Sequence, residues 1–438
     1  MRVVVIGAGH VGLVTAGALA ALGHDVVAVD EVEEKVRGLR DGVFPFFEPG
    51  LQELVGRGVS EGCLRFAVEP ADVLGDADVV FLCVGTPARA SGEANLVWVE
   101  RAARSIAGHL ARPIVVVEKS TVPAGTAERL LAVLRLQRPD LAGEIEVVSN
   151  PEFLREGQAV QDSLQPDRIL VGARSARGFE TMRRLYQPLI ERGVQLIETD
   201  IPTAELAKHA CNAFLAMKIS YANGLARLCE RAGADVTVVA DVMGSDPRIG
   251  RDFLDAGLGY GGYCFPKDLQ AFERLAARLG YDFRLLREVE RINDEAVIAA
   301  VDKVKDALWN LDDKRIALLG LAFKPGTDDV RFSPPLELAR KLLDGGANVI
   351  GYDPQAGANA KSELAELAIA SSAYDAVEGA HCMVLCTEWE EFRSLDLDRV
   401  KTLLAQPIVV DARNMFDPAE MRAMGFVYQG TGRPGGVS

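Results

Sequence analysis

The chain has 438 residues, of which 49% are hydrophobic, and this length and composition predict two or three globular domains with packed cores. Its net charge of −15 argues against nucleic acid or an anionic membrane as a general partner, because an acidic surface repels phosphates. Seven cysteines without regular spacing favour reduced thiols in a cytoplasm. Cys382 and Cys386 lie in an apolar run without further ligands nearby, so we predict no metal site.

The start of the chain has the pattern of a dinucleotide-binding unit. The β-branched run Val3–Ile6 predicts a strand buried on both faces, and Gly7-Ala8-Gly9-His10-Val11-Gly12 then opens a helix. In this pattern the first glycine makes the tight turn, the second admits a pyrophosphate, and the third packs the helix against the strand. A signal peptide could begin similarly, but the glycine spacing argues against one. Elsewhere no apolar run reaches the about 18 residues of a membrane span, so we expect none.

A second predicted strand, Asp25–Val29, ends at Asp30. This carboxylate would accept hydrogen bonds from the adenosine ribose and repel a 2′-phosphate, which favours NAD over NADP. Further parallel strands are predicted at 79–84, 114–117 and 146–148, and their carboxyl ends should converge on one crevice.

Two acidic residues follow the last of these strands. Glu152 and Glu156 would share a face if Pro151 opened a helical turn, although both could simply complement a helix N-terminus.

A long helical pattern from Pro202 to about Ala232 is expected to connect domains. Lys208 and Asn212 are four residues apart in an apolar stretch, so they should share one partly buried face. A buried lysine needs a partner or a task. The plainer interpretation is a salt bridge at a domain interface.

One lone thiol stands in Gly259-Tyr260-Gly261-Gly262-Tyr263-Cys264-Phe265-Pro266-Lys267-Asp268. The glycines would let the backbone approach a ligand closely, and Lys267 would favour a thiolate. The alternative is a turn before a helix starting near Leu269, with Cys264 buried as a small hydrophobe and Asp268 as the N-cap. The stretch alone does not separate these interpretations.

The C-terminal third repeats the opening. After a helical pattern from Phe283 to about Leu311 come a strand at 315–320, a turn over 324–331, a helix, and a strand ending at Asp353. We therefore predict an α/β protein with two doubly wound Rossmann-like domains joined by a long central helix. The expected divisions are 1–200, 201–310 and 311–438, and the Gly-rich residues from Gly430 onward are expected to be disordered.

The first loop of this second domain has lost the glycine triplet and contains Lys324 and Arg331. Two cations suit another diphosphate, although Lys324 alone could be a solvated loop charge.

Seven ordered motifs resemble those of the UDP-glucose 6-dehydrogenase family, within the wider nucleotide-sugar dehydrogenases, over essentially the whole chain. They are GAGHVG from Gly7, FEPGL from Phe47, KSTVPAGT from Lys119, NPEFLREG from Asn150, ELAKHACN from Glu205, GYGGYCFPKD from Gly259 and FKPGTDDVR from Phe323. The resemblance implies an NAD-binding N-terminal domain, a UDP-binding C-terminal domain and a central helix that forms the core of a dimer. Tyr263 stands where many members have serine, which is a tolerated variation.

The resemblance also implies roles for individual residues. Cys264 resembles the family nucleophile, and Lys208, Asn212 and Asp268 resemble the groups around the reacting oxygen. The acid–base and water-positioning residues are matched by Thr121, Glu152 and Glu156. Implied cofactor contacts are Gly7, Gly9, Val11, Gly12, Asp30, Lys35, Thr86, Thr121, Glu156, Lys267 and Arg331. Implied substrate contacts are Glu152, Phe153, Leu154, Lys208, Asn212, Tyr260, Gly261, Lys324 and, from a neighbouring subunit, Arg248.

The activity implied is the NAD-dependent four-electron oxidation of UDP-glucose to UDP-glucuronate, through a thiohemiacetal and a thioester on Cys264, by a cytoplasmic homodimer or larger homo-oligomer in polysaccharide biosynthesis. An alternative is a dehydrogenase of another nucleotide sugar, such as UDP-N-acetylmannosamine or GDP-mannose. A non-catalytic NAD-responsive protein is a third hypothesis, but it would not need Cys264, Lys208, Asn212 and Asp268 together.

Overall fold

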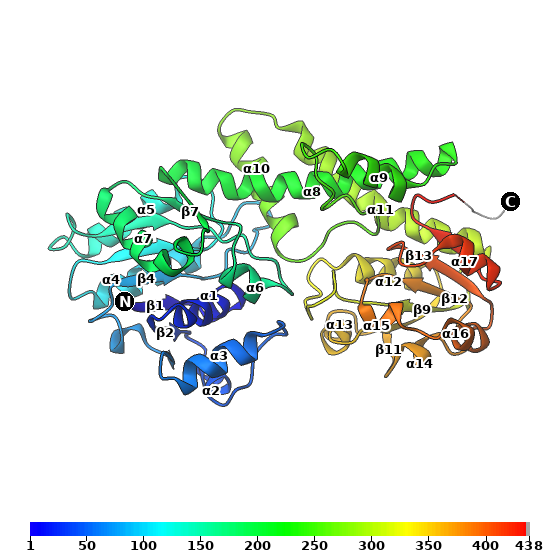
Figure 1. The fold of residues 1–438 in the computed structure, drawn as a ribbon, viewed down its shortest axis with the longest axis horizontal. Helices are drawn as coiled ribbons and strands as arrows, with labels where there is room; N and C mark the ends of the chain where they lie inside the picture. The colour runs from blue at the N-terminus through cyan, green and yellow to red at the C-terminus, as the bar shows by residue number, and fades with distance from the viewer. Residues whose placement is uncertain (435–438) are drawn as a thin grey trace. The chain divides into compact units, whose positions relative to one another are not determined.

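The computed structural model describes residues 1–434, and the chain divides into two compact units (Figure 1). Unit 1 comprises Met1–Cys211 and Gln270–Tyr281, and unit 2 comprises Asn212–Leu269 and Asp282–Ser438. None of the helices within the described range is long and apolar enough to cross a membrane.

Unit 1 is built on an eight-stranded sheet in the order β3-β2-β1-β4-β5-β6-β7-β8, in which only β6 and β7 pair antiparallel. Its strands are β1 (Arg2–Ile6), β2 (Asp25–Val29), β3 (Leu64–Ala67), β4 (Val79–Leu82), β5 (Val115–Glu118), β6 (Glu146–Ser149), β7 (Arg168–Gly172) and β8 (Gln195–Thr199). Its helices are α1 (His10–Ala21), α2 (Glu33–Arg40), α3 (Leu51–Ser60), η1 (Pro70–Asp72), α4 (Val97–His109), α5 (Thr126–Gln137), α6 (Ala159–Leu164) and α7 (Ala176–Ile190).

The core of unit 1 lies on both faces of this sheet. Val3 and Val5 of β1 pack in one hydrophobic cluster, while Val4 and Ile6 pack in another. Because successive strand residues point to opposite faces, a continuous β-branched run fits a strand covered on both sides.

Unit 2 contains a six-stranded, wholly parallel sheet in the order β11-β10-β9-β12-β13-β14. Its strands are β9 (Arg315–Leu319), β10 (Asn348–Tyr352), β11 (Ala368–Ile369), β12 (Cys382–Leu385), β13 (Ile408–Asp411) and β14 (Val427–Gly430). Its helices are α9 (Val236–Gly244), α11 (Arg284–Leu308), α12 (Pro334–Asp344), α13 (Gly357–Glu363), α14 (Ala373–Val377), α15 (Glu390–Arg393), α16 (Leu397–Leu403) and α17 (Pro418–Ala423). Helices α8 (Ile201–Ala232) and α10 (Cys264–Arg278) belong partly to each unit. The predicted α/β fold with two doubly wound sheets and a long central helix is confirmed.

The two sheets repeat the same first turn. Gly7 and Gly320 have φ values of +97° and +96°, and a Cβ at either would collide with the chain that follows the neighbouring strand. Asp30 and Asp353 follow the second strand of each sheet, and each accepts hydrogen bonds from backbone amides of its turn. The repeat predicted from the sequence is therefore present in the backbone as well as in the strand order.

The structure decides two points that the sequence left open in the middle of the chain. Helix α10 begins at Cys264 and not near Leu269, so Asp268 lies inside the helix and is not its N-cap. Pro151 opens no helical turn, because the Glu152 carboxylate accepts the N–H of Leu154 at 2.7 Å and holds the segment in an irregular turn.

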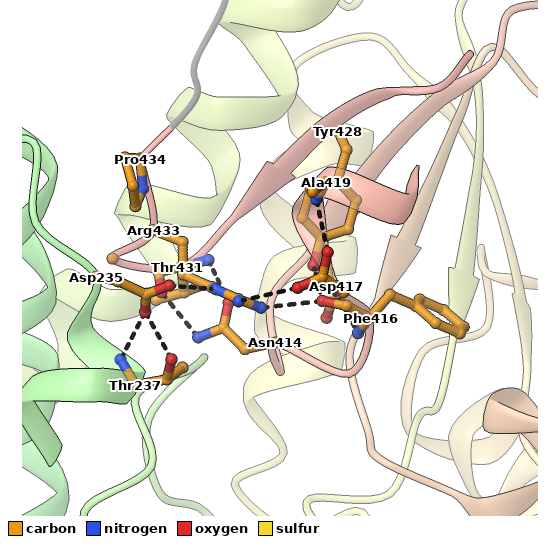
Figure 2. A network of polar contacts seen from close by, with 12 residues as sticks. Asp235, Thr237, Asn414, Phe416, Asp417, Ala419, Tyr428, Thr431, Arg433 and Pro434 are labelled. Carbon is orange, nitrogen blue, oxygen red and sulfur yellow. Dashed lines mark hydrogen bonds and ion pairs between the residues drawn. The ribbon is translucent and has the colours of Figure 1, made fainter. Parts of the chain in front are cut away.

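The predicted disorder from Gly430 is wrong as far as Pro434, while 435–438 lie outside the described residues. Arg433 Nε lies 3.1 Å from Asp235 Oδ2, and Arg433 Nη1 donates to the carbonyl of Phe416 at 2.9 Å (Figure 2). Gly432 donates its N–H to Glu230 Oε1 at 2.8 Å. The prediction considered only the glycine-rich composition and missed these contacts of Arg433, which we call the Arg433 clamp.

Candidate functional site

The turn between β1 and α1 in unit 1 has space and polarity for a phosphate. A Cβ at Gly12 would collide with the Gly7 carbonyl, whereas a Cβ at Gly9 would meet no atom within 4 Å. Helix α1 has no acidic residue in its first turn and no side-chain cap. Its first N–H groups, at the positive end of the helix dipole, therefore suit the pyrophosphate of a dinucleotide.

Asp30 is tied to this turn. Its Oδ2 accepts the N–H of Ala8 at 2.9 Å and lies 2.7 Å from Lys35 Nζ, and its Oδ1 accepts the N–H of Val32 at 3.1 Å. The carboxylate is therefore fixed beside the glycine turn with a half-buried lysine next to it. These two groups fit the place of an adenosine ribose in this fold.

His10, the first residue of α1, was not singled out from the sequence. Its Nε2 lies 2.7 Å from Glu48 Oε2, and its Nδ1 lies 3.6 Å from Glu156 Oε1. Burial lowers the pKa of His10, but the two carboxylates outweigh burial and raise it to about 9. His10 thus links the dinucleotide turn to Glu156. In the sequence, the position of His10 inside the glycine motif was the one sign that it belongs to the site.

The loops after β4 and β5 meet as predicted, because the Thr86 hydroxyl donates to the carbonyl of Thr121 at 2.9 Å. Helix α8 holds this turn from the other side. The His209 ring lies 3.0 Å from the carbonyl of Val122, and the Glu205 carboxylate accepts two backbone N–H groups of 125–127. Thr121 therefore stands on a well-fixed segment. The residues His209 and Glu205 belong to the ELAKHACN motif but were assigned no site role.

Lys208 is buried and paired. Its Nζ lies 3.1 Å from Glu152 Oε1 and 5.3 Å from the centre of the Phe153 ring. All three residues belong to unit 1, so the predicted need of Lys208 for a partner is met within this unit. Glu152 also accepts the N–H of Leu154, so Lys208 contacts Glu152 and Phe153 of the NPEFLREG motif, whereas Glu156 of this motif lies beside His10.

Lys119, a half-buried residue of unit 1, is a second lysine with a partner in the NPEFLREG motif. Its Nζ lies 3.2 Å from Asn150 Oδ1, which also accepts the Tyr186 hydroxyl at 2.7 Å. Burial lowers the pKa of Lys119, partly offset by Glu152. The sequence motifs contain Lys119 and Asn150, but without the structure nothing showed that they support the turn before Glu152.

The group around Cys264 lies in unit 2. Cys264 is partly buried as the first residue of α10, at the positive end of a helix dipole, where negative charge is favoured. Asp268, one helical turn later and 1% exposed, accepts from Asn212 Nδ2 and from Lys267 Nζ, each at 2.6 Å. The thiol therefore shares a helix face with a buried carboxylate held by two donors.

The glycines before Cys264 admit another loop of the same unit. A Cβ at Gly261 would collide with the carbonyl of Phe332, and a Cβ at Gly262 would stand 2.6 Å from the Phe323 ring. Gly262 also donates its N–H to the carbonyl of Arg331 at 3.0 Å. In this structure the glycines serve close approach to the 323–332 loop, and the predicted approach of a ligand stays a prediction.

The Tyr263 ring lies close to two cations that are candidates for binding the cofactor. The Arg331 guanidinium lies 4.4 Å from the centre of its ring, and Lys267 Nζ lies 5.5 Å away. The tyrosine at this position therefore has a structural use that serine would not have.

Tyr260 is fixed by Asn293, whose side chain accepts its N–H at 2.7 Å and donates to its carbonyl at 3.1 Å. The Tyr260 hydroxyl is buried without a hydrogen-bond partner among residues 1–434, which suits a polar ligand atom. Lys324 lies over the Phe323 ring at 5.6 Å, and Arg413, which the sequence did not single out, donates to the Phe323 carbonyl at 3.4 Å. The position of Arg413 just after the predicted strand β13 could have marked it as a candidate site residue.

Arg248 differs from these residues. Its side chain is 87% exposed and pairs with Asp246 within the same loop. Its predicted role toward a neighbouring subunit stays a prediction.

Three family models match the chain. They describe the NAD binding domain, the central domain and the UDP binding domain of the UDP-glucose/GDP-mannose dehydrogenase family, over residues 1–190, 202–295 and 317–418. The UDP-glucose 6-dehydrogenase of Rhizobium meliloti is 45% identical over 99% of this chain and 100% of its own length. That of Pseudomonas aeruginosa is 43% identical over 99% and 98%.

Solved structures agree with these matches. A UDP-glucose dehydrogenase from Pyrobaculum islandicum superposes with a TM-score of 0.90 at 37% identity, over 99% of this chain and 98% of that one. A UDP-D-ManNAc dehydrogenase from Pyrococcus horikoshii gives a TM-score of 0.86 at 29% identity, over 99% of both chains. The chain is thus an NAD-dependent oxidoreductase, and it belongs to the UDP-glucose/GDP-mannose dehydrogenase family.

Proposed function

We propose that the protein oxidises UDP-glucose to UDP-glucuronate with two molecules of NAD. The observation that carries the proposal is Cys264 at the start of α10, one turn before the buried Asp268. A simple alcohol dehydrogenase needs no such thiol. Oxidation of a primary alcohol to an acid passes through an aldehyde, which cannot give up a second hydride easily until a nucleophile makes its carbon tetrahedral.

The proposed chemistry runs in three stages. Loss of the first hydride and of the hydroxyl proton gives the aldehyde. The Cys264 thiolate adds to the aldehyde carbon, and loss of a second hydride converts the resulting thiohemiacetal into a thioester. Water then hydrolyses the thioester, releasing the carboxylate and restoring the thiol.

The surrounding residues are assigned by their pairing. Lys208 and Asn212 would donate hydrogen bonds to the reacting oxygen, and each is held by a carboxylate, Glu152 and Asp268 respectively. Such a donor contributes roughly 3–4 kcal/mol to the transition state in comparable sites. Asp268 and Thr121 would hold the water that takes the first proton, and Glu152 would assist hydrolysis.

The nucleotide contacts are assigned residue by residue. The glycine turn with Asp30 and Lys35 would bind NAD, and Lys267 and Arg331 would reach its phosphates. Lys324, Tyr260 and the backbone of Phe153 and Leu154 would bind the nucleotide sugar. The free hydroxyl of the buried Tyr260 supports this assignment.

UDP-glucose is favoured as the substrate because relatives that are 43% and 45% identical over nearly the whole chain are UDP-glucose 6-dehydrogenases. The similarity to the UDP-D-ManNAc dehydrogenase, at 29% identity, keeps that sugar as a second candidate. NADH formation with UDP-glucose, UDP-N-acetylmannosamine and GDP-mannose distinguishes them. We expect UDP-glucose to give the highest kcat/KM and two NADH for each sugar consumed, and a stoichiometry of one would contradict the thiol mechanism.

A variant tests the covalent step directly. Cys264→Ser should bind NAD like the wild type but lose steady turnover, because a hydroxyl is a far weaker nucleophile than a thiolate. Normal turnover by this variant would remove the covalent step from the mechanism. Cys63→Ser, at a partly buried thiol outside the proposed site, is the matched control and should retain activity.

We also propose a homodimer built on α8. Phe214, Tyr221 and Leu228 recur every seven residues along this helix and are 58%, 54% and 61% exposed. Large apolar side chains at this spacing form one stripe that suits a second copy of the helix. Sedimentation should show a dimer, and replacing Tyr221 by Glu should shift it toward monomer. A cytoplasmic location stays a prediction, supported by the seven free cysteines of the described chain.

A further inference from the structure

A groove of about 290 Å³ in unit 1 is lined by four arginines. Arg89 comes from the loop after β4, Arg129 from the start of α5, and Arg274 and Arg278 from successive turns of α10. None of the glycine-turn residues of the dinucleotide site lines it. The groove is therefore separate from the NAD pyrophosphate position.

Among the described residues, the arginines of this groove have no carboxylate partners. Within residues 1–434, none of the four arginines forms an ion pair with a carboxylate, and the side chain of Arg89 donates to the amide oxygen of Asn95 at 3.4 Å. The one carboxylate that lines the groove belongs to Glu93, which accepts from the hydroxyl of Ser91.

Two arginines on or near the adjacent helices are paired with carboxylates. On α4, Arg104 pairs with Glu100 at 2.7 Å, and Arg174 pairs with Glu128 of α5. The chain has 63 acidic and 48 basic residues, yet the four groove arginines pair with none of the carboxylates in the described part of the chain. A guanidinium cannot relieve repulsion by losing its proton, so such a group favours a bound anion.

Helix dipoles do not account for the cluster. Arg278 lies in the last turn of α10, where a cation is favourable, but Arg129 lies near the positive end of α5, where a cation is unfavourable. The buried side chains of Ala271 and Leu275 form the apolar part of the groove wall, while the four arginine side chains are exposed and accessible to a ligand from solvent.

We propose that this groove binds a small anion carrying at least two phosphate groups. Arginine forks match phosphate oxygens in bidentate geometry. The four arginines and the Glu93 carboxylate give the groove a net charge of about +3, and two phosphate groups of about −1.5 to −2 charges each at pH 7 would balance it. The volume lies just below the roughly 300–1,000 Å³ usual for small-molecule sites, which suits a compact anion and not a second dinucleotide.

Such a ligand would touch the turn that bears Thr121. Pro123, Ala124 and Thr126 line the groove as well as following Thr121 in the chain. The anion would therefore bind beside the candidate acid–base segment without occupying the dinucleotide site.

The test uses inorganic pyrophosphate and titration calorimetry on the full chain saturated with NADH and UDP, so that the nucleotide sites are filled. The proteins are the wild type, Arg129→Gln, the double variant Arg274→Gln/Arg278→Gln, and Arg135→Gln. Arg135 is the matched control because it is exposed on the same helix as Arg129 but does not line the groove. Thermal unfolding of each protein confirms that these exposed substitutions leave the fold intact.

We expect the wild type and the control to bind pyrophosphate equally, with affinity that falls as salt is added, and the groove variants to bind about tenfold or more weakly. No binding to the saturated wild type, or equal binding by all four proteins, would overturn the proposal. Citrate bound as tightly as pyrophosphate would overturn the assignment to phosphates. Because binding is measured without turnover, the result is independent of the proposed oxidation of UDP-glucose.

Discussion

Lys208 Nζ lies 3.1 Å from Glu152 Oε1, and only 5% and 7% of the two side chains are exposed. The two buried charges depend on each other, because removing one leaves the other in a poorly solvated place. The same pair supplies a proposed hydrogen-bond donor and a proposed base, so one substitution affects both stability and catalysis. Comparing a single variant with a double variant separates the two effects.

Lys208→Met should lower the free energy of unfolding by about 3–5 kcal/mol, since Glu152 loses its partner. It should also lower kcat by about 10²–10³-fold, the usual loss of one oxyanion donor. Adding Glu152→Gln should restore much of the stability but not the activity. Urea unfolding and initial rates check this, and a double variant with wild-type turnover would exclude the catalytic role.

Glu118 predicts an unusual pH dependence of stability. Burial, with a smaller contribution from Glu205, raises its pKa from 4.5 to about 8, although hydrogen bonds from Ser120 oppose the shift. The folded protein therefore keeps a proton that the unfolded chain has lost, and stability falls as pH rises from 4.5 through 8.

Glu118→Gln removes this titration, so its stability advantage over the wild type should grow across that window, by up to about 5 kcal/mol. Urea unfolding at pH 5, 7 and 8.5 measures it. Glu144→Gln, at an exposed position, is the control and should follow the wild type at every pH. Parallel curves for wild type and Glu118→Gln would show that Glu118 is not protonated in the folded state.

The contribution of His10 to folding stability should depend on pH as expected of a stabilising cation. Its pKa is about 9 in the folded protein against 6.5 ordinarily, so its contribution is complete below pH 6.5 and disappears as pH rises through 9. His10→Gln should therefore be less stable than the wild type at pH 6, by up to about 3 kcal/mol, and nearly equal to it at pH 10. Thermal unfolding across this range gives the comparison, and His109→Gln, at the exposed end of α4, should show no such convergence.

Arg433 should anchor the C-terminal segment of unit 2. Arg433→Ala removes the ion pair with Asp235 and the hydrogen bond to Phe416, and should cost about 1.5–3 kcal/mol, as usual for a charge-assisted hydrogen bond. Hydrogen exchange should increase around residues 230–237 and 414–417. Arg433→Lys keeps the positive charge but loses the forked guanidinium, so its stability should lie between those of the wild type and Arg433→Ala. Unchanged hydrogen exchange in Arg433→Ala would show that Arg433 does not anchor this segment.

Much of the fold could be predicted because its signals are local. The β-branched run of β1 and the glycines that follow it impose a strand, a tight turn and a helix, and the same sequence of elements identified β9 and β10. Strand ends were less certain: 79–84 was predicted, whereas β4 ends at Leu82. The last residues of such a run are apolar whether or not they are paired.

Long-range pairing was not predictable from local pattern. His10 meets Glu48 and Glu156 from distant parts of the chain, and Arg433 reaches back to Asp235. Nor could spacing show that the glycines before Cys264 make room for the Phe323 ring. The candidate residues themselves were found because their motifs recur in a family, and their catalytic roles stay proposals.

The bonds of Asp30 set a limit on changing the coenzyme preference by design. An enzyme engineered for NADP must lose the carboxylate that repels the 2′-phosphate, but here the same oxygens also accept the N–H groups of Ala8 and Val32. A shorter or apolar replacement would loosen the glycine turn while it admits the phosphate. A successful exchange would have to replace the segment from Asp30 to Lys35 as a whole and supply new acceptors for both amides.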